Sequence, residues 1–156
     1  MGKSFSDEEL EKVVLDYINV INNKLEKEDY SIECLSDIEK NVLFVYEMEL
    51  EVKNGGIHQY FYNSTGDCWV EMLNALRIMK AEAIIRLFER ALAVFPNSMP
   101  SQKRDERWKQ LDQIGKEGEL KLEELSQEYF SMYGNFPEQD IYTKLGIYIV
   151  NTGVCE

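Results

Sequence analysis

The fold is decided by the stretch Ser36–Lys53, which reads SDIEKNVLFVYEMELEVK. It begins with a capping box, in which the side chains of Ser36 and Glu39 can each pair with a backbone amide of the first helical turn. The residues that follow are apolar on more than one face, which is typical of a helix that runs through the middle of a bundle. The alternation of apolar residues with glutamates after Val45 would also suit a strand, but the cap and the length favour a helix.

The N-terminal segment predicts a second, amphipathic helix that packs on the core formed by about residues 35–152. Ser6 and Glu9 form another capping box, and apolar residues then recur at steps of three and four along one stripe. The stripe consists of Leu10, Val13, Val14, Tyr17, Ile18, Ile21 and Leu25. We therefore expect a helix over residues 6–27 that contributes one face to a shared core.

The rest of the chain also has helical periodicity. Asn54-Gly55-Gly56 ends the central helix, because glycine enters the left-handed conformation of a helix C-terminus without steric cost. A short aromatic segment, residues 57–62, leads to further helices that are predicted at residues 69–79, 83–95, 101–114 and 122–133, and after Pro137. Gly115 and Gly118 separate the third of these helices from the fourth. The sequence thus predicts an all-α fold, with about seven helices in a single compact domain over residues 1–156.

Composition and charge narrow the class of protein. The 156 residues are 44% hydrophobic and 29% charged, as in ordinary globular proteins. The three cysteines, Cys34, Cys68 and Cys155, are few and widely spaced, which favours free thiols in a reducing compartment. No apolar run is long enough to span a bilayer and no signal peptide is recognisable, so we expect a cytoplasmic protein.

The net charge of −12 is unevenly distributed. Residues 1–53 carry 14 acidic and 6 basic side chains, residues 54–116 carry 7 and 9, and residues 117–156 carry 8 and 2. Both ends are therefore acidic and the middle is slightly basic. This balance disfavours direct binding of nucleic acid or of an anionic membrane, and it favours a basic protein as the partner.

Catalytic chemistry has little support in the sequence. His58 is the only histidine and has no nucleophile next to it. Glu47 and Glu51 lie four residues apart and could join His58 as metal ligands, but the second carboxylate pair of a di-metal bundle is missing. We therefore expect no enzyme, no metal and no cofactor. The basic stretch Lys103–Lys109 is interrupted by two acids and is interpreted as a solvated helix face with internal charge pairs.

The stretch Val45–Asn63 carries a family signature, a glutamate-bearing helix that ends in Asn-Gly-Gly and is followed by a short aromatic segment. The signature residues are Glu47, Glu51, Asn54, Gly55, Gly56, Gln59, Tyr60, Phe61 and Asn63. It resembles that of a bacterial family of helical domains of unknown function whose best-described member is a DNA-mimic protein. The resemblance covers about residues 35–152 and includes Ala83–Pro96 and the last helix. The chain departs from the family pattern at Ile78-Met79-Lys80-Ala81, where we expect Ile-Gly-Ala.

The resemblance implies a compact helical fold, often a homodimer, and for the mimic member a carboxylate surface that occupies the DNA-binding face of a helix-turn-helix transcription factor. The signature residues themselves are expected to be structural. Carboxylates at positions i and i+4 of a helix stand about 5 to 6 Å apart, a separation of the same order as that of neighbouring phosphates in B-DNA. The candidate partner-binding residues are Asp7, Glu8, Glu11, Glu28 and Asp29 near the N-terminus and Glu117, Glu119, Glu123, Glu124 and Glu128 near the C-terminus.

Three functional hypotheses follow from these observations. The first is an acidic protein-binding module that acts as a DNA mimic toward a DNA-binding transcription regulator or another basic protein. The second is an immunity or antitoxin-like inhibitor of a basic toxin or nuclease. The third is a hydrolase or metal enzyme that uses His58 with Glu47 and Glu51.

Overall fold

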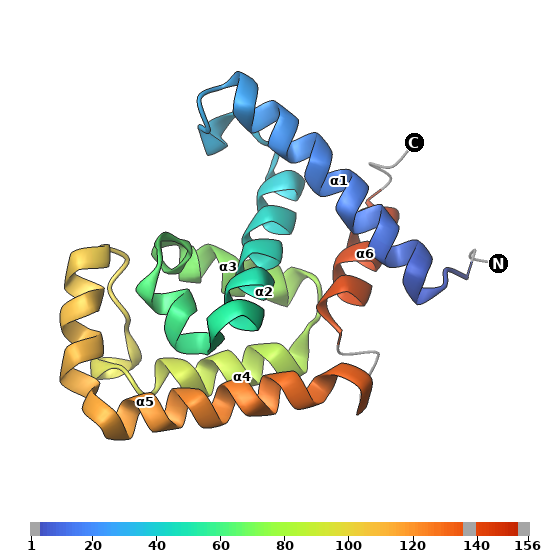
Figure 1. The fold of residues 1–156 in the computed structure, drawn as a ribbon. Coiled ribbons are helices and arrows are strands. Elements are labelled where there is room, and N and C mark those ends of the chain that lie inside the picture. The colour runs from blue at the N-terminus through green and yellow to red at the C-terminus, as the bar shows by residue number, and fades with distance from the viewer. Residues whose placement is uncertain (1–3, 136–139, 153–156) are drawn as a thin grey trace.

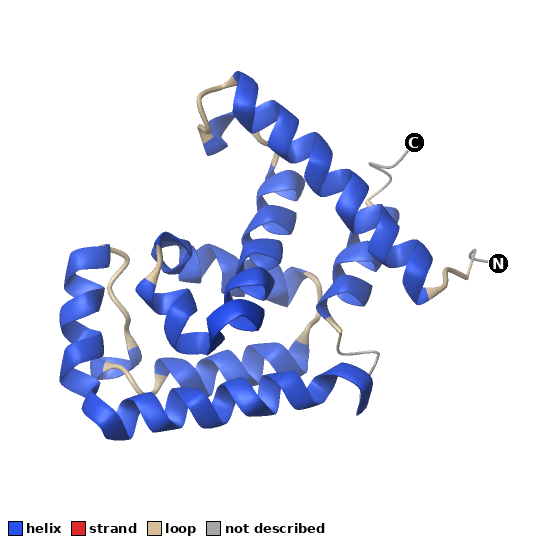
Figure 2. Cartoon of the chain, in the orientation of Figure 1, coloured by secondary structure: helices blue, strands red, loops and turns tan. Residues whose placement is uncertain are grey.

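The computed structural model describes residues 4–135 and 140–152, and the described part of the chain contains helices and loops but no strands (Figure 2). The α-helices are α1 (Asp7–Lys27), α2 (Asp37–Tyr62), α3 (Trp69–Ile78), α4 (Glu82–Leu92), α5 (Arg104–Asn135) and α6 (Ile141–Asn151). Three 3-10 turns join them, η1 (Ile32–Cys34), η2 (Ser64–Cys68) and η3 (Pro96–Ser98). The predicted all-α class is confirmed.

Helix α2 is central, as its apolar faces predicted. It contacts α1, α3, α5 and α6 (Figure 1). Its capping box is present, with the Ser36 hydroxyl accepting from the Glu39 amide and the Glu39 carboxylate accepting from the Ser36 amide. The cap of α1 has the same form, between Ser6 and Glu9. Helix α1 packs chiefly on α6, where Gly146 allows the close approach of Leu10.

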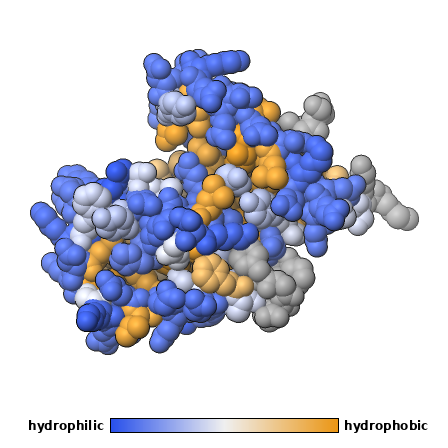
Figure 3. All heavy atoms as spheres, in the orientation of Figure 1, coloured by the Kyte–Doolittle hydropathy of each residue, from blue (hydrophilic) through white to orange (hydrophobic). Residues whose placement is uncertain are grey.

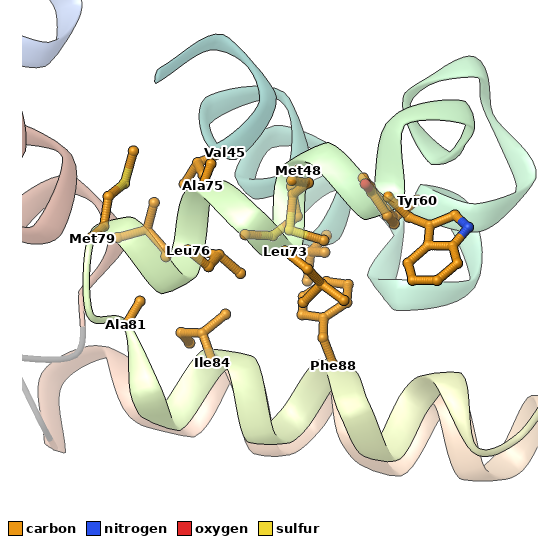
Figure 4. Packing of buried hydrophobic residues seen from close by; sticks show 14 of the residues in the cluster. Val45, Met48, Tyr60, Leu73, Ala75, Leu76, Met79, Ala81, Ile84 and Phe88 are labelled. Atoms are coloured by element: carbon orange, nitrogen blue, oxygen red, sulfur yellow. The ribbon is translucent and has the colours of Figure 1, made fainter. Parts of the chain in front are cut away.

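The core is one cluster of buried apolar side chains to which all six α-helices contribute. Figure 4 shows Ile84 and Phe88 of α4 pointing toward Leu73 and Leu76 of α3, with Met48 of α2 above them. All five side chains are at most 3% exposed. This packing explains why α4, whose apolar residues all lie on one stripe, forms a stable helix of 11 residues.

Two helix boundaries differ from the sequence-based prediction. The predicted helices at 101–114 and 122–133 are parts of one element, α5, which bends visibly (Figure 1). Gly115 lies within it and has a φ of +59°, so the predicted break occurs as a bend. Similarly, α2 continues beyond Gly56 to Tyr62 after a local departure from helical geometry. The predicted start of the last helix at Pro137 lies outside the described residues, and α6 is capped by Asp140, whose side chain accepts from the Tyr142 amide.

The junction between α3 and α4 contains the departure from the family pattern. Lys80 has a φ of +57°, the left-handed conformation that glycine adopts most easily. The Ala81 amide donates to the Leu76 carbonyl at 3.0 Å, the long hydrogen bond of a Schellman helix end. The lysine therefore occupies a strained position that a glycine would fill without cost.

Candidate functional site

The kink of α2 arises from Gly55 and Gly56. Gly56 has φ 81° and ψ −176°, a conformation that is essentially restricted to glycine. A Cβ atom there would lie 2.8 Å from the Ser126 Oγ atom of α5. The same hydroxyl accepts a hydrogen bond of 2.9 Å from the Ile57 amide, which the kink releases from the helical ladder. The glycine pair thus turns α2 and fastens it to α5.

The polar signature residues hold this kink in place. Gln59 Nε2 donates to Glu51 Oε2 at 2.7 Å, and Asn63 Nδ2 donates to the same oxygen at 3.0 Å. The Gln59 side chain crosses the kink so closely that a Cβ atom on Gly55 would lie 1.8 Å from its Oε1 atom. Asn54 is exposed at the start of the kink. The hydrogen bonds of Glu51 with Gln59 and Asn63, and the close approach of Gln59 to Gly55, therefore hold the backbone in the kinked conformation.

The aromatic signature residues belong to the core. Tyr60 and Phe61 are at most 1% exposed, and their rings meet edge to face with centroids 5.2 Å apart. Phe61 also packs against Phe95, which lies between α4 and η3, with ring centroids 4.8 Å apart. These contacts join the segment after the kink to the rest of the domain.

Arg107 corrects the interpretation of Lys103–Lys109 as a solvated face, because its side chain is 0% exposed. Its guanidinium donates to the carbonyls of Phe61, Asn63 (2.9 Å) and Ser101 (2.8 Å) and to the Asp67 carboxylate (2.7 Å). Arg107 thereby satisfies the carbonyls that are left over where α2 ends. Sequence reasoning missed it because burial of an arginine requires acceptors from several separate segments.

The carboxylates of α5 divide between two faces. Glu128 accepts two hydrogen bonds of 2.8 Å from Arg90 of α4. Glu124 lines a hollow of about 240 Å³ together with Arg90 and Lys121. Glu119 and Glu123 lie on the other face, and neither has a basic partner in the described part of the chain.

A cavity of about 530 Å³ opens between the kink of α2 and this second face of α5. Its lining consists of Gly55, His58, Lys116, Glu119, Leu120, Glu123 and Ser126. Leu120 is 64% exposed although it is strongly apolar. Figure 3 shows hydrophobic atoms of this kind scattered among hydrophilic ones on the visible face. Leu120, which stands between the charged residues Glu119 and Lys121, is the sequence signal that could have marked the cavity.

An aromatic row leads away from this cavity. The His58 imidazole stacks on the Tyr62 ring, with centroids 6.2 Å apart and planes 18° apart. Tyr62 in turn stacks on Trp108 of α5, with centroids 5.4 Å apart and planes 27° apart. Tyr62 and Trp108 are 49% and 41% exposed, and Trp108 Nε1 donates to the Tyr62 carbonyl at 2.7 Å. We call His58, Tyr62 and Trp108 the aromatic row.

The acidic residues of the N-terminal segment lie elsewhere. Asp7, Glu8 and Glu11 are at the beginning of α1, whereas Glu28 and Asp29 follow its end. Because α1 has 21 residues, these two groups are about 30 Å apart. Figure 1 shows α2 between α1 and α5. The two acidic segments therefore do not meet on one surface.

The geometry gives the metal-enzyme hypothesis no support. Within residues 4–135 and 140–152, no three histidine, cysteine or carboxylate side chains are grouped so that they could hold a metal ion, and His58 with Glu47 and Glu51 is no exception. Glu51 is occupied by Gln59 and Asn63. Burial, with a smaller contribution from the nearby Glu51 charge, raises the pKa of Glu47. Cys34 and Cys68 are free thiols, and Cys155 lies outside the described residues.

Membrane insertion receives no support from the helices either. Throughout the portion of the chain that the structure covers, none of them combines the length and the apolar character that a bilayer crossing demands.

Comparison with known proteins places the chain in a family. A family model described as DMP19-like protein, after DNA mimic protein 19, matches residues 33–152. No curated protein and no solved structure matches the chain significantly. The match includes the kink, the polar residues that hold it, Arg107 and the cavity, and it agrees with the resemblance seen in the sequence. The chain belongs to the family of DMP19-like proteins.

Proposed function

We propose that this protein is a binding module, not an enzyme, and that the exposed carboxylates of α5 bind the DNA-contacting surface of a basic protein. The observation that carries the proposal is the pair Glu119 and Glu123. Both are exposed, they lie four residues apart, and they have no basic partner within the described residues. Like charges at this spacing destabilise a helix by about 0.2–0.5 kcal/mol, so helix stability does not account for them.

The acidic residues at the beginning of α1 are accounted for differently. Asp7 and Glu8 lie in the first turn, next to the capping residues Ser6 and Glu9. Negative charge in a first turn stabilises a helix through the helix dipole. The α5 pair lacks this local explanation, which is why we place the binding surface on α5.

Family membership supports the same class of function, since the family takes its description from a DNA-mimic protein. A transcription regulator whose recognition helix carries basic residues is the partner that we consider first. The inhibitor hypothesis involves the same surface and differs only in the partner, which would be a toxin or a nuclease.

The test compares capture of partners by two charge-reversed proteins. One carries Glu119→Lys with Glu123→Lys, and the control carries Glu8→Lys with Glu11→Lys on α1. Each protein and the unmodified chain are immobilised, exposed to lysate of the source organism at low and moderate salt, and the bound proteins are identified by mass spectrometry. We expect a basic protein that is released by salt, because exposed charge pairs are screened, and that is lost only from the α5 variant.

The identity of the captured protein separates a regulator from a toxin or nuclease. Capture that is unaffected by reversal of the α5 pair would refute the proposed surface.

A further inference from the structure

The cavity between the kink of α2 and α5 has chemically different sides. Leu120, together with the imidazole of His58, provides an apolar and aromatic wall, and Gly55 contributes bare backbone. Glu119 and Glu123 provide two carboxylates, against the single basic side chain of the lining, Lys116. Gln127 donates to Glu123 Oε1 at 2.9 Å, which leaves the second oxygen of that carboxylate available. A ligand that fits must combine an apolar stem with a cationic end.

The aromatic row extends this surface. Half-exposed aromatic rings bind planar cations well, because a guanidinium group can stack on an aromatic face. The rings of His58 and Tyr62 are nearly parallel, at 18°, and the first of them lines the cavity. An apolar wall, a carboxylate pair and a stacking face thus adjoin one another in the fold, although the residues come from two helices.

We propose that the cavity is the specificity-determining pocket for an arginine side chain of the basic partner. The aliphatic stem of the arginine packs on Leu120, and its guanidinium group pairs with Glu119 and Glu123. The guanidinium plane lies beside His58, the member of the aromatic row that lines the cavity. This inference rests on the proposed function and adds the chemistry that the partner must present. Lysine fits less well, since its ammonium is a strongly hydrated point charge that neither stacks nor forms a fork. A cavity of about 530 Å³ also accommodates the backbone from which the arginine extends.

The experiment uses two fluorescently labelled peptides of equal charge, hexa-arginine and hexa-lysine. Their affinities for the full-length protein are measured by fluorescence anisotropy at constant ionic strength. We expect hexa-arginine to bind about tenfold more tightly, which corresponds to about 1.4 kcal/mol. Leu120→Ser and Glu123→Gln should each reduce this preference severalfold. Both side chains are exposed, so both variants should fold, and circular dichroism verifies this.

Matched controls are available on α1, away from the cavity. Leu15 is 40% exposed and Glu11 is exposed, so Leu15→Ser and Glu11→Gln remove the same groups from a different surface. These variants should keep the preference for arginine. Equal binding of the two peptides, binding of neither, or a preference that survives both cavity variants would overturn the pocket. The proposed function fails by a different result, namely unchanged capture after charge reversal of Glu119 and Glu123.

Discussion

Replacement of Arg107 by alanine tests the account of how α5 holds the end of α2. The change removes a buried cation that donates to three carbonyls and to Asp67. Its loss leaves the buried Phe61 carbonyl without this donor, and an unsatisfied buried polar group costs about 1–3 kcal/mol. Arg104→Ala is the control. Arg104 donates to the same Asp67 carboxylate at 3.1 Å but its side chain is 42% exposed, so its loss should cost about 0–1 kcal/mol.

The free energy of unfolding is measured by urea titration, with the helical circular dichroism signal as the probe. Equal destabilisation by Arg107→Ala and Arg104→Ala would refute the reasoning.

The pH dependence of the free energy of unfolding is a second measurement of the same contact. Burial alone would raise the pKa of Asp67, but hydrogen bonds from Arg107 and Arg104 outweigh it and hold the pKa below its ordinary value. The stabilisation is therefore present above the unfolded-state pKa of about 3.9 and is lost as the pH falls through the lower folded-state pKa. Arg107→Ala should weaken this acid dependence.

Three further substitutions test other parts of the fold by the same urea titration. Gly56→Ala should destabilise the protein by about 1–3 kcal/mol or more, because the backbone conformation excludes a side chain and the added Cβ would approach the Ser126 hydroxyl. An unchanged midpoint of the urea transition would contradict the backbone conformation described for the kink. Lys80→Gly should stabilise it by up to about 1 kcal/mol, because it removes left-handed strain at the end of α3, and a destabilised variant would show that the lysine is not strained there. Glu47→Gln should stabilise the protein at pH 7, because burial raises the folded-state pKa of Glu47 and so penalises its charged form. The stabilisation should disappear in acid, where Glu47 is neutral. A variant less stable than the unmodified chain at pH 7 would contradict this prediction.

Much of the fold follows from local sequence. The capping boxes at Ser6 and Ser36 place the beginnings of α1 and α2, since their hydrogen bonds involve residues three positions apart. The stripe of apolar residues in α1 and the apolar faces of α2 likewise predict which helix is central. Gly115 predicts an interruption of the helical segment. Whether the helix nevertheless continues across this glycine, as α5 does, depends on how the segments before and after it pack against the rest of the domain.

The candidate site depends far less on local sequence. The residues of the kink, Gly55 and Gly56, and the polar residues that hold it could be recognised from their family signature. That Gly56 faces Ser126, 70 residues later in the chain, could not be recognised, because nothing in the sequence states which turn of α5 passes there. The same holds for the stacking of Tyr62 on Trp108 and for the burial of Arg107.

The sequence by itself determined the helical class, the caps, an interruption of the central helix at Gly55 and Gly56, and the acidic balance of the two ends, because each depends on residues close together in the chain or on composition. Only the tertiary structure decided which acidic side chains lie close together. It separates the N-terminal carboxylates from those of α5, neutralises Glu128 with Arg90, and leaves Glu119 and Glu123 beside Leu120 and an open cavity. The physical reason is that charge is a property of each residue, whereas a charged surface depends on which helices pack side by side.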